Sequence, residues 1–152
     1  MKTSAGLVLF RRTVNHLEVL LVHPGGPIWA KRDSGAWSIP KGEVSEGEDL
    51  FVAARREFEE ELGTPPPGSA TMPLGSITQK GGKIVHAWGV EGEFDTTTLK
   101  SNTFTMVWPP NSGQQHEFPE VDKATFFPLD TAKQMINAAQ IPLLERLQGR
   151  LK

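Results

Sequence analysis

The chain has 152 residues, 38% of them hydrophobic, and a formal net charge of −2 at pH 7, and its size suits a single domain spanning residues 1–152. It has no cysteine, which excludes a disulfide framework and a thiolate metal site, and no apolar run near the roughly 20 residues that a membrane span needs. The slight negative charge argues against a general nucleic-acid binder. The first residues carry no signal-peptide pattern, so we expect a soluble, cytoplasmic protein.

The first forty residues are predicted to form three strands and a long loop. Residues 4–11 and 17–22 are strand-like, with a polar hairpin loop at 13–16. Both strands are continuous apolar runs, which indicates burial on both faces of a sheet. Glycine and proline mark residues 23–36 as a loop, and residues 37–42 follow it as a short strand.

The stretch from Gly42 to Gly63 is predicted to contain an amphipathic helix. Ser45 and Glu48 fit a capping box, which would start the helix near residue 46. Gly63 fits a C-cap, and the three prolines after Thr64 prevent the helix from continuing. With helical spacing, one side of this segment is apolar, formed by Phe51, Ala54, Phe58 and Leu62.

A second side of the same helix gathers carboxylates. Glu57, Glu60 and Glu61 are spaced i, i+3, i+4, about 110° round from the apolar side. Like charges at this spacing destabilise a helix by a few tenths of a kcal/mol per pair. A solvated acidic face is one interpretation. The other is that a divalent cation offsets the repulsion, since clustered carboxylates suit Mg²⁺ or Mn²⁺.

The second half of the chain is predicted to add four strands. Two of them, residues 74–79 and 83–94, are joined by a tight turn at Gly81 and Gly82. A loop at 95–102 precedes a strand at 103–108, and the breakers and amides of 109–119 predict a long loop. The last strand is expected at 121–128.

Two helices are expected at the C-terminal end. Asp130 fits the N-cap of a helix that runs through Ala139, and Pro142 starts a last helix whose leucines face inward. The order of elements predicts an α/β/α sandwich.

The polar residues of the acidic helix resemble the signature of the Nudix hydrolase family. That pattern is matched by Gly42, Glu48, Arg56, Glu57, Phe58, Glu60, Glu61 and Gly63, and Thr64 departs from its final apolar position. The resemblance implies a mixed sheet between helices. It also implies hydrolysis of a phosphoanhydride in a nucleoside diphosphate linked to another group, with Mg²⁺ or Mn²⁺ as cofactor.

The resemblance also assigns residue roles. Metal ligands would be the carboxylates of Glu57, Glu60 and Glu61 and the carbonyl of Gly42. Glu57 and Glu60 are candidates for the general base, with Glu120 as a third. A Glu near the last strand often completes the site in this family, a place that Glu120 fits and for which Glu117 competes. Arg56 and Glu48 would pair and orient the ligands.

We expect the substrate to be a small-molecule nucleotide, and we expect neither a nucleic-acid partner nor membrane association. Residues 4–11 and 39–42 resemble the diadenosine tetraphosphate hydrolase branch of the family, which implies cleavage of dinucleoside polyphosphates. That branch commonly stacks adenine on a tyrosine after the signature, and this chain has no tyrosine. Trp88, Trp29 or Phe104 would have to replace it, because any aromatic ring can stack on a base.

Basic side chains could meet the substrate phosphates. The candidates are Lys41, Lys80 and Lys83, with Lys31 and Arg32 beside Trp29 and with His86 on a strand. The simpler interpretations are solvated lysines, a surface loop and a histidine satisfied within the sheet. Three further activities stay open: a nucleoside triphosphate or ADP-sugar pyrophosphohydrolase, a diphosphoinositol polyphosphate hydrolase, and a non-catalytic nucleotide-binding module.

Overall fold

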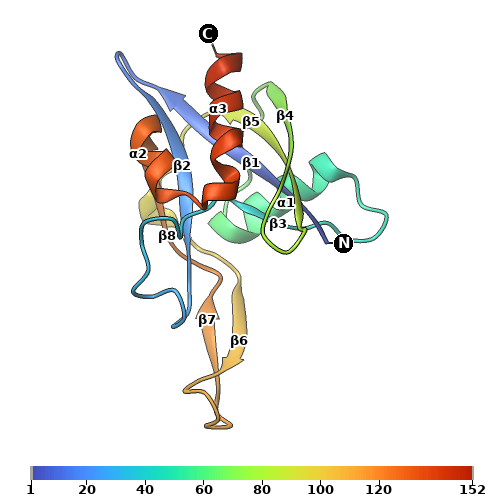
Figure 1. The fold of residues 1–152 in the computed structure, drawn as a ribbon, viewed down its shortest axis with the longest axis vertical. Coiled ribbons are helices and arrows are strands. Elements are labelled where there is room, and N and C mark those ends of the chain that lie inside the picture. The colour runs from blue at the N-terminus through green and yellow to red at the C-terminus, as the bar shows by residue number, and fades with distance from the viewer. Residues whose placement is uncertain (1, 152) are drawn as a thin grey trace.

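A computed structural model describes residues 2–151 of the chain. Its centre is a six-stranded sheet in the order β4-β5-β1-β2-β8, with β3 also paired to β1 (Figure 1). The strands are β1 (Thr3–Arg12), β2 (Leu17–Pro24), β3 (Lys41–Glu43), β4 (Thr71–Thr78), β5 (Ile84–Glu91) and β8 (Val121–Pro128). β1 and β5 run parallel and the other pairs are antiparallel, so the sheet is mixed.

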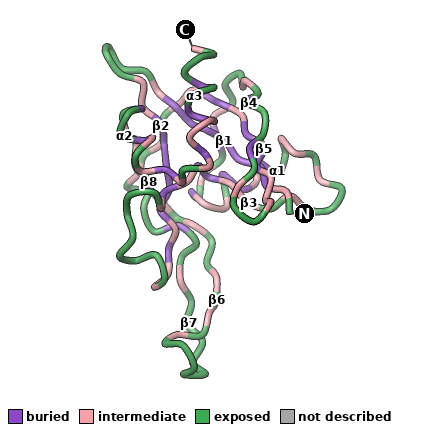
Figure 2. Tube along the Cα trace, viewed as in Figure 1, coloured by how far each residue is buried: buried purple, intermediate pink, exposed green. Residues whose placement is uncertain are grey.

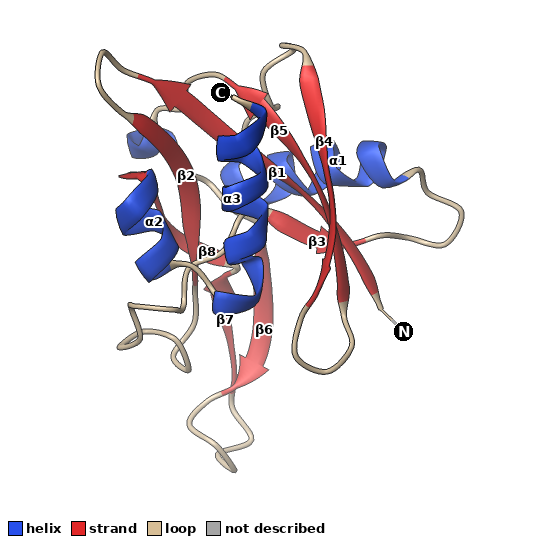
Figure 3. Cartoon of the chain, turned by 45° about the horizontal axis from the view of Figure 1, so that its top comes forward, coloured by secondary structure: helices blue, strands red, loops and turns tan. Residues whose placement is uncertain are grey.

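Helices cover both faces of this sheet. α1 (Leu50–Leu62) lies on one face, and α2 (Leu129–Met135) and α3 (Ile141–Arg150) lie on the other (Figures 1 and 3). Alternate residues of β1 enter the two halves of the core, Leu7 and Leu9 on the α1 side and Val8 and Phe10 on the α3 side. Burial on both faces explains the continuous apolar runs and confirms the predicted α/β/α sandwich.

The remaining regular elements are short. Two 3₁₀ helices occur at Thr96–Thr98 and Ala138–Gln140. None of the helices in residues 2–151 has the length and apolarity to cross a membrane.

A two-stranded hairpin projects from the body of the molecule. It consists of β6 (Thr103–Val107) and β7 (Gln115–Pro119), which pair with each other as a separate sheet, and most of its residues are at least partly exposed (Figures 1 and 2). The predicted loop at 109–119 is therefore wrong in its second half. β7 was missed because neither of its faces is fully buried, and its sequence lacks the apolar alternation that marks a half-buried strand.

The acidic helix begins four residues later than the capping box predicted. Its N-cap is Asp49, whose Oδ2 accepts a hydrogen bond from Val52 N–H at 3.1 Å. Glu48 Oε1 does accept from Ser45 N–H at 3.0 Å, but this bond closes a turn that precedes the helix. The predicted C-cap at Gly63 is confirmed, with a left-handed φ of 87°.

The strand predicted at residues 37–42 forms only at its end, as β3 (Lys41–Glu43). Trp37 and Ser38 form only isolated bridges, to Ile136 and Val22, among the described residues. Pro40 follows them and has no N–H for a ladder, although its carbonyl accepts from Leu7 N–H at 3.2 Å. Regular pairing therefore starts only at Lys41.

The helix predicted from Asp130 to Ala139 ends early, at Met135. It begins after Pro128, so Asp130 lies in its first turn and is not the cap. Trp37 N–H donates to the Met135 carbonyl at 3.1 Å, and Asn137 N–H donates to the Trp37 carbonyl at 2.7 Å. These tertiary bonds hold the intervening residue extended and stop the helix.

Phe58 tests how much α1 contributes to the core. Its ring is 1% exposed in the cluster between α1 and the sheet. Phe58→Ala should therefore lower the free energy of unfolding by about 3–5 kcal/mol in urea denaturation. The exposed neighbour Glu59 supplies the control, and Glu59→Gln should change stability by less than about 0.5 kcal/mol. Equal effects of the two substitutions would contradict this packing.

Candidate active site

The predicted carboxylates lie where β1 changes its partner. Residues 4–6 of β1 pair with β3, whereas residues 10–12 pair with β2. The segment from Trp37 to Pro40 therefore enters the sheet between β1 and β2, bonded to each through Leu7 and Val22. α1 packs across this point, so its acidic side faces β3.

Glu57 is buried against the backbone of β3. Its residue surface is 9% exposed, so it is not part of a solvated acidic face. A Cβ at Gly42 would overlap the Glu57 carboxylate. The absence of a side chain at position 42 is therefore what allows the carboxylate to lie on the strand.

Arg56 ties three carboxylates together. Its Nε and Nη2 donate to the two oxygens of Glu48 at 2.8 and 2.9 Å, which is a bidentate pair. Its Nη1 donates to Glu57 at 2.9 Å and to Glu60 at 2.8 Å. The hydrogen bonds from Arg56 hold the pKa of Glu48 at about 2. The pairing of Arg56 with Glu48 that the sequence suggested is thus present, and it extends to two of the candidate ligands.

The carboxylates of this site influence one another. Burial raises the pKa of Glu57, the charge of Glu60 raises it further, and Arg56 opposes both effects. Burial raises the pKa of Glu61 to about 8 against the opposing charge of Lys41. Burial and then the charge of Glu60 raise the pKa of Glu120. Glu120, directly before β8, therefore interacts with the carboxylates of α1 although its own surface is exposed, whereas Glu117 is exposed on β7 of the hairpin.

The donor chemistry of the site fits a hard divalent cation. The carboxylate oxygens gathered here are the ligands that Mg²⁺ and Mn²⁺ prefer, and the backbone of Gly42, the further ligand that the resemblance implies, lies against Glu57. Within residues 2–151 no three acidic or histidine side chains are already gathered round one point. The Arg56 guanidinium pairs with both Glu57 and Glu60 and offsets part of their charge.

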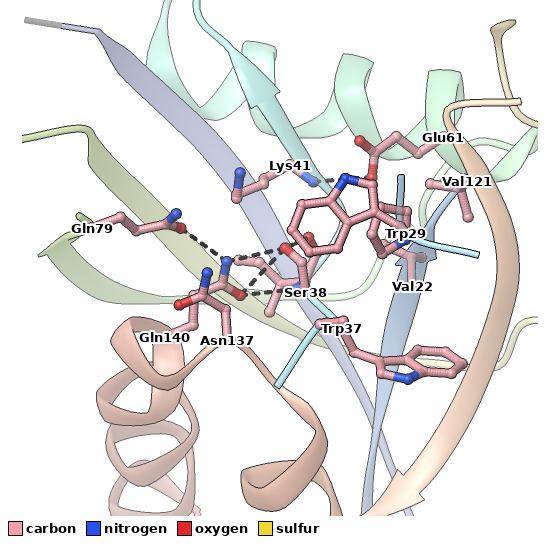
Figure 4. A pocket seen from close by; sticks show the side chains of 13 residues that line it. Val22, Trp29, Trp37, Ser38, Lys41, Glu61, Gln79, Val121, Asn137 and Gln140 are labelled. Atoms are coloured by element: carbon pink, nitrogen blue, oxygen red, sulfur yellow. Dashed lines mark hydrogen bonds between the residues drawn. The ribbon is translucent and has the colours of Figure 1, made fainter. Parts of the chain in front are cut away.

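A cavity of about 220 Å³ opens beside these carboxylates (Figure 4). Lys41 and Glu61 line one side of it, and Lys41 N–H donates to Glu61 Oε1 at 3.3 Å. Burial and then the nearby charge of Lys83 lower the pKa of Lys41 to about 8. Lys41 and Lys83, two of the residues predicted to contact phosphate, thus lie close to each other, while Lys80 is exposed at the turn after β4.

The opposite wall of this cavity is a chain of polar side chains that sequence reasoning missed. Gln140 is 1% exposed, and its Oε1 accepts from Ile39 N–H at 3.0 Å. Its Nε2 donates to Ser38 at 3.0 Å and to Gln79 at 2.9 Å (Figure 4). These residues are far apart in the sequence, and no local pattern marks them, although a buried glutamine needs such partners.

A second cleft, of about 410 Å³, lies on the other side of Glu61. Trp29 lines both the cavity and this cleft, and the hairpin contributes Phe104 and Met106 to the cleft. Arg32 lies over the Trp29 ring, 5.4 Å from its centroid. Two of the predicted aromatic candidates, Trp29 and Phe104, are thereby brought to the carboxylates.

Other residues predicted to contact the substrate line neither the cavity nor the second cleft. Trp88 packs edge-on against Phe51 of α1, with ring centroids 5.4 Å apart, and it lines neither the cavity nor the second cleft. His86 is half-buried on β5, and Lys31 is exposed on the loop that carries Trp29. Of the three aromatic residues predicted to stack a base, Trp29 and Phe104 therefore line the openings beside Glu61, and the buried Trp37 also lines the cavity.

Comparison with known proteins identifies the family. Residues 1–147 match the NUDIX domain. The chain belongs to the Nudix family. Nudix proteins generally use divalent metal ions, which agrees with the oxygen donors gathered on α1.

Relatives with assigned activities match part of the chain. An RNA pyrophosphohydrolase from Caulobacter vibrioides is 52% identical over 50 residues, which cover 30% of this chain and 29% of the relative. The asymmetrical bis(5′-nucleosyl)-tetraphosphatase of Caenorhabditis elegans is 40% identical over 58 residues, 38% of each chain. These matches span well under half the length of either relative.

Solved structures share the whole fold of this Nudix protein. A binary complex of the C. elegans Ap4A hydrolase has a TM-score of 0.68 at 22% identity and covers 97% of both chains. The Nudix domain of Shewanella oneidensis NrtR, complexed with ADP ribose, has a TM-score of 0.68 at 20% identity, covering 99% of this chain and 88% of that one. At such identity the similarity concerns the fold.

Gly42 provides a direct test of the site geometry. A methyl group at this position would displace the Glu57 carboxylate, so Gly42→Ala should lower kcat by at least about tenfold in a phosphoanhydride hydrolysis assay. Gly68 is a matched control, since a Cβ there meets no atom within 4 Å. Gly68→Ala should leave the rate unchanged, and full activity of Gly42→Ala would argue against a role for Glu57 at this place.

Proposed function

We propose that this Nudix protein hydrolyses a phosphoanhydride bond in nucleoside-diphosphate-linked compounds, and that dinucleoside polyphosphates such as diadenosine tetraphosphate are its substrates. The observation that carries the proposal is the place of Glu61. It lines both the cavity and the second cleft, and it interacts electrostatically with Glu57 and Glu120. A polyphosphate that crossed the carboxylates would have an opening on each side for its two ends.

The metal would be held by Glu57, Glu60, Glu61 and the carbonyl of Gly42, with Mg²⁺ as the cofactor and Mn²⁺ as a substitute. A divalent cation there supplies neutralisation of phosphate charge and a lowered pKa of water. Arg56 and Glu48 act as positioning residues, because they hold Glu57 and Glu60 in place. Lys41 and Lys83 bind the substrate phosphates, and exposed Lys80 is a further candidate.

The chain's own carboxylates would move the proton of the attacking water. A general base needs a pKa near the working pH, and burial raises the pKa of both Glu57 and Glu120 in that direction. We keep Glu57, Glu60 and Glu120 as the candidates for the base, and Glu120 is the one that is not also assigned to the metal. The proton would leave toward solvent on the side of Glu120, which is exposed.

Similarity to the C. elegans tetraphosphatase supports the dinucleotide, in sequence over 58 residues and in fold over 97% of the chain. The RNA pyrophosphohydrolase match supports RNA as a second candidate. An ADP-sugar is compatible with the fold, because the NrtR domain takes ADP ribose, and a nucleoside triphosphate is a smaller ligand of the same kind.

Hydrolysis of a diphosphoinositol polyphosphate and a purely binding role are less well supported. Lys41 is the basic residue that lines the cavity, whereas Lys31 and Arg32 are exposed, so these three do not form the dense cationic site that a diphosphoinositol polyphosphate needs. A non-catalytic module would be expected to lose carboxylates of the signature, and this chain keeps them. The cytoplasmic location expected from the sequence stays a prediction.

Metal dependence is the first test of the activity. Hydrolysis should stop in excess chelator and return with Mg²⁺ or Mn²⁺, and Glu60→Gln should lower kcat at least about a hundredfold. Glu59→Gln, on the exposed neighbour, is the matched control and should stay active. Full activity in chelator, or equal rates of the two variants, would refute the proposed chemistry.

The substrate is tested by comparing kcat/KM values. Diadenosine tetraphosphate should exceed ADP-ribose, nucleoside triphosphates, diphosphoinositol polyphosphate and 5′-triphosphorylated RNA by tenfold or more, equivalent to about 1.4 kcal/mol of transition-state binding. Products identified by mass should be a nucleoside triphosphate and a monophosphate. A tenfold preference for any other compound would transfer the assignment to that compound.

A further inference from the structure

The second cleft has aromatic and aliphatic walls and an acidic floor. One wall is the loop after β2, with Ile28 and Trp29, and the other is the hairpin, with Phe104 and Met106. Its floor holds Glu61 and Glu120. Ile28 is 53% exposed and Trp29 is 37% exposed, so large apolar surface is open to solvent directly beside the carboxylates.

Two glycines, Gly25 and Gly26, allow the loop after β2 to approach the hairpin closely at the inner end of this cleft. A Cβ at Gly25 would overlap the Pro119 carbonyl, and a Cβ at Gly26 would lie 2.8 Å from the tip of the Phe104 ring. Gly25 N–H also donates to the Glu120 carbonyl at 2.9 Å. The loop and the hairpin therefore meet at their bases, so the cleft has a fixed inner end.

The hairpin is rooted in the elements that carry the carboxylates. Asn102 N–H donates to the carbonyl of Glu60 at 2.8 Å, and Glu120 N–H donates to the carbonyl of Asn102 at 2.8 Å. The first strand of the hairpin thus begins at the C-terminal end of α1, and its second strand ends at Glu120. These two hydrogen bonds fix the base of the hairpin, and with it Phe104, relative to the carboxylates.

Charge indicates what part of a substrate the hairpin contacts. Residues 102–119 contain no lysine or arginine and one carboxylate, Glu117. Nucleic-acid backbones are bound chiefly through Lys and Arg contacts to phosphate. A hairpin of this composition therefore fits an uncharged, planar group at the end of a ligand, and not a polynucleotide that continues past the carboxylates.

We propose that the cleft between the hairpin and residues 24–29 binds one base of a dinucleoside polyphosphate by stacking it on Phe104 and Trp29. Met106 and Ile28 extend the apolar walls, and the cleft offers few polar groups to read the edge of the base, so the site accepts purines and pyrimidines with little discrimination. This inference rests on the proposed function, since the polyphosphate must cross Glu61 and Glu120 to reach the cleft.

Equilibrium binding separates this inference from hydrolysis. Titration calorimetry with a methylene-bridged, uncleavable analogue of diadenosine tetraphosphate and Mg²⁺ should give a Kd that Phe104→Leu raises about tenfold or more, as loss of stacking requires. Trp29→Phe, which keeps an aromatic ring on the opposite wall, should stay within about threefold of the wild type. Thr105→Ala is the matched control, since Thr105 is the exposed neighbour on the opposite face of β6, and it should have no effect.

The outcomes are distinct. Equal Kd values for Phe104→Leu and Thr105→Ala, or no binding by the wild type, would overturn the stacking site, even if the dinucleotide is hydrolysed. Aromatic-dependent binding without hydrolysis of the parent dinucleotide would support the site and refute the proposed activity. If 5′-triphosphorylated RNA binds at least tenfold more tightly than the analogue, and Phe104→Leu weakens that RNA complex, the cleft serves a polynucleotide and the proposal is wrong.

Discussion

The arrangement of this protein's acidic centre depends on one guanidinium. Glu57, Glu60 and Glu61 lie on adjoining positions of α1, and their mutual repulsion would spread them in the absence of a positive charge. Arg56 bonds to Glu57 and Glu60 and anchors itself through both oxygens of Glu48, before the helix. The same guanidinium therefore balances the charge of the site and fixes the loop that precedes α1. A bound cation would share this balancing role with Arg56.

The centre also depends on how β1 is paired. Along one edge of β1, residues 10–12 pair with β2 and residues 4–6 pair with β3. The segment from Trp37 to Gly42, which is regular strand only at its end, can therefore enter between them. That segment brings the Gly42 backbone under Glu57 and Lys41 beside Glu61. Its inner end is held by Gln140, a residue from the far side of the sheet, which bonds to Ile39 and Ser38. The buried amide thus links the C-terminal helices to the acidic site.

The hairpin extends the centre beyond the body of the fold. Its base is hydrogen-bonded to the last turn of α1 and adjoins the start of β8, while most of its surface stays exposed. Phe104 and Met106 face the loop that carries Trp29. The result is a carboxylate site with a polar cavity on one side and an apolar cleft on the other, so the two ends of a bound ligand would lie in different surroundings.

The sequence by itself determined the family, the α/β/α class, the apolar face of α1 and the set of clustered carboxylates. These features depend on spacing within a short stretch, where helical geometry alone decides which side chains meet. Tertiary structure decided the rest. Pairing with Trp37 ended α2 at Met135, and the placement of Glu48 between Ser45 and Arg56 moved the start of α1 to Leu50. Trp88 packs against Phe51, whereas Phe104 lines the second cleft. Contacts between segments distant in the sequence decide these placements, and no local sequence pattern marks such contacts.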